Sequence, residues 1–344
     1  MKINDFFEND KIYVIAEISQ NHDGSLGQAH AYIDAVAKTG ADAVKFQTHI
    51  ASEESTVHEP FRVKFSYSDR TRYDYWKRME FSEGEWQGLY DHATSLGLDF
   101  LSSPFSVKAL ELLNRIGVPA WKFGSGEIFN NVLLNKAIET GKPLILSTGL
   151  SKFDEIQAQV NKILQAGNQL ILMECTTAYP SKADQISLNL VKKYIECFPC
   201  PIGISDHSAT IYPGIAAVAL GARCVEVHVT MSREMFGPDV PASITTSELS
   251  DLVKGVHFVN EMRHCDIDKT TLSDEAKKLR QTFSKSLYAN RDIVAGEKIN
   301  SEDIGIKKPH NDDAMGVEDY DALIGAVVKK DVKKDEIMKQ EYIK

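Results

Sequence analysis

Short apolar runs alternate with stretches of helical periodicity through most of this 344-residue chain, and few folds satisfy this order. We count eight such units. The runs are hydrophobic along their whole length, which is typical of parallel strands buried on both faces. An α/β fold with a closed (β/α)8 barrel, the TIM barrel, is therefore favoured over a two-layer sandwich. The expected strands are 12–18, 43–48, 99–102, 120–123, 143–147, 170–175, 201–205 and 224–229.

Helices are expected between these strands, at 26–39, 82–96, 106–116, 153–166, 212–220 and 247–264. One connection is unusually long, because about 30 residues follow Thr48 before the next expected helix. This segment is rich in aromatic and charged residues. Such a composition favours a lid or substrate clamp, and a packed surface excursion is the alternative.

Two histidines end neighbouring apolar runs, as Ser205-Asp206-His207 and Glu226-Val227-His228. In a barrel, both side chains would project into the mouth formed by the strand ends, where catalytic residues gather. Imidazole suits an exchangeable divalent metal with open positions for water and substrate. Two histidines hydrogen-bonded within the rim remain the alternative interpretation.

Lys45 and Lys122 also lie at strand ends, and two inward lysines predict an anionic substrate. Glu174 and Glu226 are candidate ion-pair partners for these lysines. The surrounding hydroxyl and amide groups that could bind the anion are Gln47, Ser103, Ser125, Ser147, Thr177 and Ser205. Carboxylates that could transfer protons or bind sugar hydroxyls are Glu17, Asp23, Glu127, Asp206 and Asp239.

Composition excludes several partners. The net charge of −10 argues against nucleic acid and against an anionic membrane surface. We expect a cytoplasmic protein, since no signal sequence or membrane-spanning run is present. Five scattered cysteines fit reduced thiols, and the single Cys197-Phe198-Pro199-Cys200 motif lacks a second pair for zinc.

The composition changes after His264, and this change predicts the domain boundaries. We expect a catalytic barrel at 1–268, a linker at 269–283 and a small domain at 284–344. The small domain has short strand-like runs and is too short for a deep core.

Several ordered motifs resemble those of the sialic acid synthases, and the resemblance covers essentially the whole chain. The motifs are Asn21-His22-Asp23-Gly24, Val44-Lys45-Phe46-Gln47, Ser102-Ser103-Pro104-Phe105, Lys122-Phe123-Gly124-Ser125-Gly126-Glu127, Leu146-Ser147-Thr148-Gly149, Thr176-Thr177-Ala178-Tyr179-Pro180, Ser205-Asp206-His207-Ser208, Glu226-Val227-His228 and Gly237-Pro238-Asp239. The resemblance implies a TIM barrel followed by an antifreeze-like (SAF) domain, in a domain-swapped homodimer.

The resemblance also implies a reaction, the condensation of phosphoenolpyruvate with N-acetylmannosamine or a related 2,4-diacetamido hexose. A divalent metal, Mn²⁺ or Mg²⁺, would be bound by His207 and His228. Catalytic positions would be Asp23, Lys45, Lys122 and Glu127. Substrate-binding positions would be Gln47, Ser103, Ser125, Ser147, Thr177, Tyr179, Ser205, Asp239 and Lys308.

Three departures from the family pattern affect substrate recognition. The long loop with Arg70, Arg72 and Trp76 differs from simpler members, where the N-acyl group would be read. Thr177 stands where some members have an amide, and Lys308 stands where some present an arginine to the sugar. A related synthase that uses a phosphorylated aldose is one alternative, for which Arg70 and Arg72 are the suggestive cations. A non-catalytic carbohydrate-binding protein is the other alternative.

Overall fold

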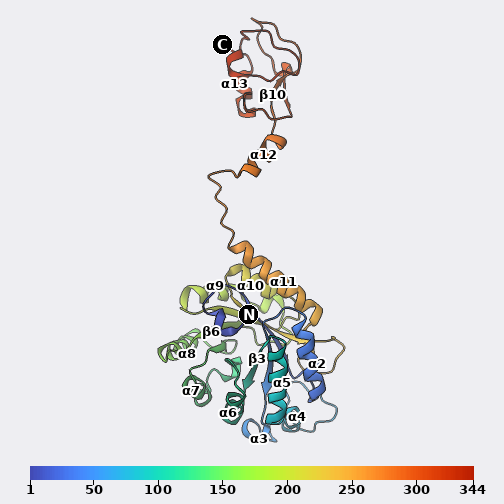
Figure 1. Cartoon of the computed structure of the whole chain (residues 1–344), viewed down its shortest axis with the longest axis vertical. Helices are drawn as coiled ribbons and strands as arrows, with labels where there is room; N and C mark the ends of the chain where they lie inside the picture. Colours follow the sequence, from blue (N-terminus) through green and yellow to red (C-terminus); the bar gives the residue numbers. More distant parts are fainter. The chain divides into compact units, whose positions relative to one another are not determined.

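The computed structural model describes all 344 residues and divides the chain into two compact units, Met1–Cys265 and Asp266–Lys344. The first unit is a ring of parallel strands surrounded by helices (Figure 1). The predicted linker, 269–283, falls in the second unit, where it contains helix α12 (Asp274–Phe283). Ser273 caps this helix by accepting a hydrogen bond from the backbone of Ala276.

The eight barrel strands pair in the order β3-β2-β1-β8-β7-β6-β5-β4, and β3 and β4 also lie in contact, so the ring is nearly closed. The barrel expected from the sequence is therefore confirmed. The strands are β1 (Tyr13–Ser19), β2 (Ala43–Thr48), β3 (Asp99–Pro104), β4 (Trp121–Phe123), β5 (Leu144–Ser147), β6 (Leu170–Cys175), β7 (Ile202–Asp206) and β8 (Cys224–Thr230), with a short β9 (Ile244–Thr245) beside β8.

The six expected helices are present as α2 (Leu26–Ala37), α5 (Glu83–Ser95), α6 (Val107–Ile116), α8 (Phe153–Gln165), α10 (Tyr212–Leu220) and α11 (Thr246–Arg263). Two further barrel helices, α7 (Asn131–Glu139) and α9 (Leu188–Cys197), were not anticipated. α7 buries Leu133, Leu134 and Ala137, and α9 buries Val191 and Tyr194.

The long connection after β2 differs from expectation, because it contains α3 (Ala51–Glu54) and α4 (Arg72–Met79). Thr71 and Asp74 form a capping box that starts α4. The helix then buries Tyr75 and Trp76 in a small apolar cluster of its own, separate from the barrel core. The segment is thus a folded excursion with its own core.

The barrel interior changes from apolar to polar along the strands. A short amino-terminal helix, α1 (Ile3–Phe6), packs against inward-facing side chains such as Ile15, Leu101 and Ile145. Two residues further along these strands, the inward positions become Glu17, Ser103 and Ser147. The apolar layer closes one end of the barrel, so the polar side chains gather at the carboxyl ends of the strands.

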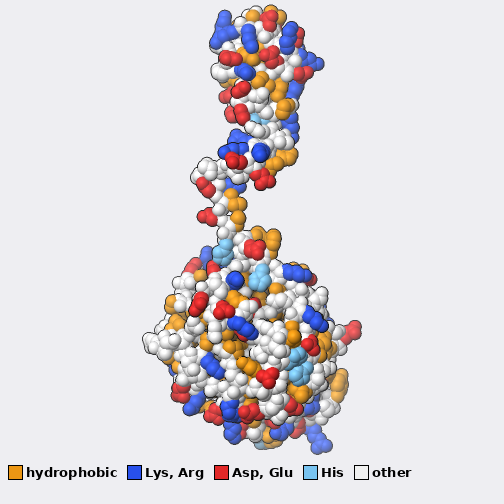
Figure 2. Space-filling view, in the orientation of Figure 1, with side chains coloured by type: hydrophobic (Ala, Val, Ile, Leu, Met, Phe, Trp, Pro, Cys, Tyr) orange, Lys and Arg blue, Asp and Glu red, His pale blue; other side chains and the backbone are white.

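The second unit has a small hydrophobic core of its own that includes Leu287, Ile293, Leu323, Val332 and Met338. Its elements after α12 are an antiparallel pair, β10 (Ser286–Ala289) and β11 (Ile304–Lys307), and the short helix α13 (Tyr320–Leu323). Figure 2 shows acidic and basic side chains interspersed on the visible face of both units. None of the helices combines the length and apolar composition needed to cross a membrane.

Candidate active site

A cavity of about 400 Å³ lies at the carboxyl ends of the barrel strands. Its inner part is lined by inward-facing residues of the strands, and its outer part by the long connection after β2 and the loop around Asp239. We call this space the main cavity. Of the residues expected from the sequence to line it, it brings together Lys45, Gln47, Ser103, Lys122, Ser125, Glu127, Ser147, Thr177, Tyr179, Ser205 and Asp239.

Two buried lysines share a carboxylate in the inner part. Lys122 Nζ lies 3.1 Å from Glu226 Oε1, and Lys45 Nζ lies 3.8 Å from the same oxygen. Lys45 also contacts Glu17 Oε2 at 2.6 Å. Two positive and two negative groups therefore meet inside the barrel, and each buried charge is compensated. Glu226 is the ion-pair partner that the sequence predicted, whereas Glu174 makes no ion pair with either lysine.

The electrostatics of this cluster keep cations available for an anion. Burial alone raises the pKa of Glu226, but the ammonium groups of Lys122 and Lys45 lower it overall. Burial also raises the pKa of Glu17, against the opposing effect of Lys45. Although desolvation disfavours the charged form of Lys45, the two glutamates raise its pKa. The glutamates outweigh desolvation, so Lys45 stays protonated.

Serine hydroxyls surround the lysines. Lys122 Nζ donates to Ser147 Oγ at 3.0 Å, and Lys45 Nζ contacts Ser103 Oγ at 3.3 Å. Ser205 Oγ donates to Glu226 Oε1 at 3.2 Å. Ser125 Oγ accepts a hydrogen bond from the backbone of Gly149 at 2.9 Å. The arrangement resembles an anion site in which hydroxyl donors complement two ammonium groups.

Gly149 allows the loop after β5 to approach the end of β6 and the loop that follows it, beside these hydroxyls. A Cβ atom at this position would lie 2.4 Å from Thr177 Oγ1 and 2.6 Å from the carbonyl oxygen of Cys175. Any larger residue would displace Thr177 from the cavity wall. The glycine is therefore required by close packing at the site.

His207 and His228 lie side by side, with ring centroids 5.2 Å apart. His207 Nδ1 donates to the carbonyl oxygen of Thr176 at 2.8 Å, which leaves the lone pair of Nε2 available. His228 Nδ1 is buried without a hydrogen-bond partner. Burial lowers the pKa of each histidine to about 3, so both rings are neutral.

These features fit a metal site. Neutral imidazoles are typical metal ligands, and the carbonyl oxygen of Thr176 orients the ring of His207 in the usual way. No group of three or more His, Cys, Asp or Glu side chains forms a complete metal-binding cluster. A cation held by the two histidines would therefore take its other ligands from water and substrate.

The outer part of the main cavity holds residues that the sequence analysis missed. Arg62 lies 4.6 Å above the Tyr179 ring and 3.6 Å from Asp239. Other missed residues are His49, Glu54, Glu59, Phe61, Phe65, Tyr75 and Phe105, whereas Arg72 and Trp76, which the sequence did suggest, also line the cavity. Most come from the long connection. Its aromatic and charged composition indicated a lid or substrate clamp, but it did not indicate which side chains face the cavity.

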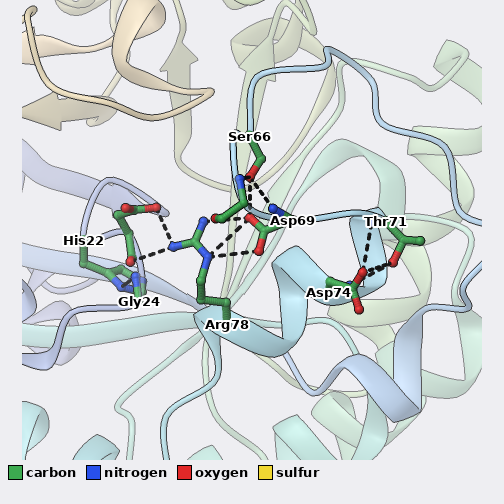
Figure 3. A network of polar contacts seen from close by, with 9 residues as sticks. His22, Gly24, Ser66, Asp69, Thr71, Asp74 and Arg78 are labelled. Carbon is green, nitrogen blue, oxygen red and sulfur yellow. Dashed lines mark hydrogen bonds and ion pairs between the residues drawn. The ribbon is translucent and has the colours of Figure 1, made fainter.

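Asp23 lies outside the residues that line the main cavity. Its carboxylate is 2.7 Å from Arg78, which also binds Asp69 (Figure 3). Asp206 faces away from the barrel interior, where it accepts hydrogen bonds from Ser208. Lys308 belongs to the second unit, where its ammonium group lies 5.1 Å from the ring of Phe283.

Comparison with known families identifies the chain. The model of the NeuB family matches residues 32–267, which is more than half of its length. The chain belongs to the NeuB family. The model of the SAF domain matches residues 284–341. The resemblance to sialic acid synthases and the presence of a SAF domain, both expected from the sequence, are confirmed.

Relatives of this NeuB-family chain are similar over nearly its whole length. An N,N'-diacetyllegionaminic acid synthase from Campylobacter jejuni is 32% identical, with 96% of this chain and 99% of the relative covered. The human N-acetylneuraminate-9-phosphate synthase is 30% identical, with coverage of 96% and 92%. The crystal structure of an N-acetylneuraminic acid synthetase from Leptospira borgpetersenii, in complex with citrate, is 28% identical, has a TM-score of 0.70 and covers 79% of this chain and 92% of its own.

Proposed function

We propose that this chain is a nonulosonic acid synthase, an enzyme that condenses phosphoenolpyruvate with an N-acylated amino sugar and releases phosphate. The observation that carries the proposal is the pair of buried lysines, Lys45 and Lys122, joined by Glu226 at the inner end of the main cavity. The names of the relatives support a synthase of this class. A protein that only bound carbohydrate would have no use for two buried ammonium groups beside two neutral histidines.

Phosphoenolpyruvate fits the inner part of the main cavity. Its phosphate and carboxylate would be bound by the two lysines and by the hydroxyls of Ser103, Ser147 and Ser205. Ser125 and Thr177 would add donors at the rim of this inner part. These groups are held in place before the substrate arrives, so they stabilise the developing charge with little reorganisation.

The condensation forms a carbon–carbon bond between C3 of phosphoenolpyruvate and the aldehyde carbon of the open-chain sugar. Water then adds at C2, and cleavage of the bond between C2 and the bridging oxygen releases phosphate. His207 and His228 would hold the metal, Mn²⁺ or Mg²⁺, which supplies Lewis acidity toward the aldehyde oxygen. The lysines keep the enol carbon beside the aldehyde throughout.

The outer part of the main cavity favours an unphosphorylated sugar. It has four carboxylates, Glu54, Glu59, Glu127 and Asp239, against two arginines. Each arginine has a carboxylate partner, Arg72 at 3.1 Å from Glu59 and Arg62 at 3.6 Å from Asp239. A sugar phosphate would meet net negative charge there, which disfavours its binding. Arg70, one of the cations suggested by the sequence, is absent from the cavity lining.

The sugar would contact Gln47, Glu127, Tyr179 and Asp239, and the aromatic rings of the outer part would pack against its acyl group.

We further propose a cytoplasmic homodimer in which Lys308 of the SAF domain binds the sugar. Two large apolar side chains on α12 support the dimer, because Leu279 and Phe283 are 50% and 66% exposed. Light scattering would test the dimer, and Lys308→Ala, with a raised KM for the sugar alone, would test the contact.

The deciding experiment measures phosphate release from phosphoenolpyruvate with three sugars: N-acetylmannosamine, its 6-phosphate and a 2,4-diacetamido hexose. Each assay is run with Mn²⁺ and with chelator. We expect metal-dependent release with an unphosphorylated sugar. Release only with the 6-phosphate would contradict the electrostatic argument, and no release with any sugar would count against the proposed reaction.

A further inference from the structure

His49 follows β2 directly and is buried between two aromatic rings. Its imidazole stacks on Trp76, with centroids 4.0 Å apart and planes 17° apart. On the other face it stacks on Phe105, at 4.4 Å and 13°. All three rings line the main cavity. The side chain of His49 is only 3% exposed, so its polar atoms depend on protein partners.

Both nitrogens of His49 face oxygen atoms. Nδ1 lies 2.5 Å from Glu54 Oε1, and Nε2 lies 3.3 Å from Gln47 Oε1. A carboxylate and a carbonyl oxygen both accept hydrogen bonds, so the contact with Gln47 requires an N–H at Nε2.

The contacts of His49 continue to the buried lysines. Gln47 Nε2 donates to Glu17 Oε1 at 2.9 Å, and Glu17 contacts Lys45 at 2.6 Å. Gln47 Oε1 also accepts from Gln20 at 3.2 Å. The carbonyl oxygen of Gln47 therefore has two donors, and its amide nitrogen keeps one N–H for the cavity. In the flipped orientation, Gln47 would present its oxygen to the cavity instead.

We propose that His49, held by Glu54, is a positioning residue that makes Gln47 a hydrogen-bond donor toward the acceptor sugar. The sugar group that this donor recognises is an oxygen acceptor, either a hydroxyl or the carbonyl of an acylamino group. A second sign of ligand binding here is Glu54 Oε2, which is buried in the cavity wall without a hydrogen-bond partner. The inference rests on the proposed function, because it requires a sugar in the outer part of the main cavity.

Kinetics of two variants test the positioning role. His49→Phe keeps the aromatic stack and removes both ring nitrogens, and Glu54→Gln removes the charge opposite Nδ1. We expect each to raise the KM for the sugar about fivefold, which corresponds to one hydrogen bond, with the KM for phosphoenolpyruvate unchanged. If His49 served packing alone, His49→Phe would resemble the wild type, and that result would overturn the inference.

A spectroscopic measurement tests the same point without turnover. In ¹⁵N-labelled protein at pH 6, the ring signals of His49 are those missing from His49→Phe. We expect a proton on Nε2 of His49 in the wild type, where it faces Gln47, whereas a bare Nε2 would refute the inference. Inactivity of the wild type with every sugar would instead count against the proposed function, so the two failures are distinguishable.

Discussion

Arg78 Nη1 lies 2.7 Å from Asp23 Oδ1, and the same guanidinium donates to Asp69 from Nε and Nη2. Asp69 lies in the long connection after β2 (Figure 3). Asp23 lies in the loop after β1. Arg78 thus ties together two loops at the carboxyl end of the barrel. Hydrogen bonds to Asp69 and Asp23 raise the pKa of Arg78, so the guanidinium stays charged.

This geometry predicts a structural role for Asp23, in place of the proton transfer implied by the family resemblance. Asp23→Asn should destabilise the protein by less than about 1 kcal/mol, because the pair is partly exposed. Its kcat should stay close to the wild-type value. Thermal unfolding and kcat at saturating substrates check this, and a large loss of kcat without loss of stability would restore the catalytic interpretation.

Loss of either proposed metal ligand should abolish turnover without unfolding the protein. His207→Ala and His228→Ala are expected to reduce kcat by at least about 100-fold and to weaken Mn²⁺ binding. Titration calorimetry with Mn²⁺ measures the binding, and circular dichroism confirms folding. His257→Ala, on the outer helix α11, provides a control that should behave as the wild type. Normal Mn²⁺ binding by a variant would remove that histidine from the site.

Removal of the ammonium group of Lys122 should affect both binding and stability. Lys122→Met keeps the aliphatic stem but leaves Glu226 with the more distant Lys45 only. We expect the KM for phosphoenolpyruvate to rise about 100-fold, in line with truncation of one partner of a buried charge pair, and the midpoint of unfolding to fall. Lys136→Met, at an exposed pair with Glu139, is the matched control. An unchanged KM would place the anion elsewhere.

Glu174 should make the stability of the metal-free protein depend on pH. Burial and the nearby Asp206 raise its pKa to about 7 in the folded state, from the ordinary value of 4.5. The folded state therefore binds more protons between these values, and stability falls as pH rises from about 4.5 to 7. Glu174→Gln should remove part of this slope and stabilise the protein by about 2 kcal/mol at pH 7.5.

Urea unfolding at pH 5.5, 6.5 and 7.5 in the presence of chelator measures this effect. Glu139→Gln, at an exposed carboxylate on α7, is the control and should leave the slope unchanged. If Glu174→Gln proved less stable than the wild type at pH 7.5, the carboxylate would be ionised and satisfied in the folded state.

The SAF domain was expected from the family resemblance. The barrel and the strand ends that carry Lys45, Lys122, His207 and His228 followed from the residues themselves. These features depend on local patterns, because a strand buried on both faces is recognisable from its own residues, and its carboxyl end is where its apolar run stops. The motifs then placed the main reactive groups on one side of the ring.

The tertiary structure decided which side chains meet. The sequence left Glu174 and Glu226 as equal partners for the lysines, and only the barrel places Glu226 inside and Glu174 among the outer polar groups. Likewise, Asp23 faces Arg78, and His49 lies between Trp76 and Phe105, across stretches of chain without regular periodicity. Such pairings depend on strand register and on the path of a long connection, and both are set by packing between residues far apart in the sequence.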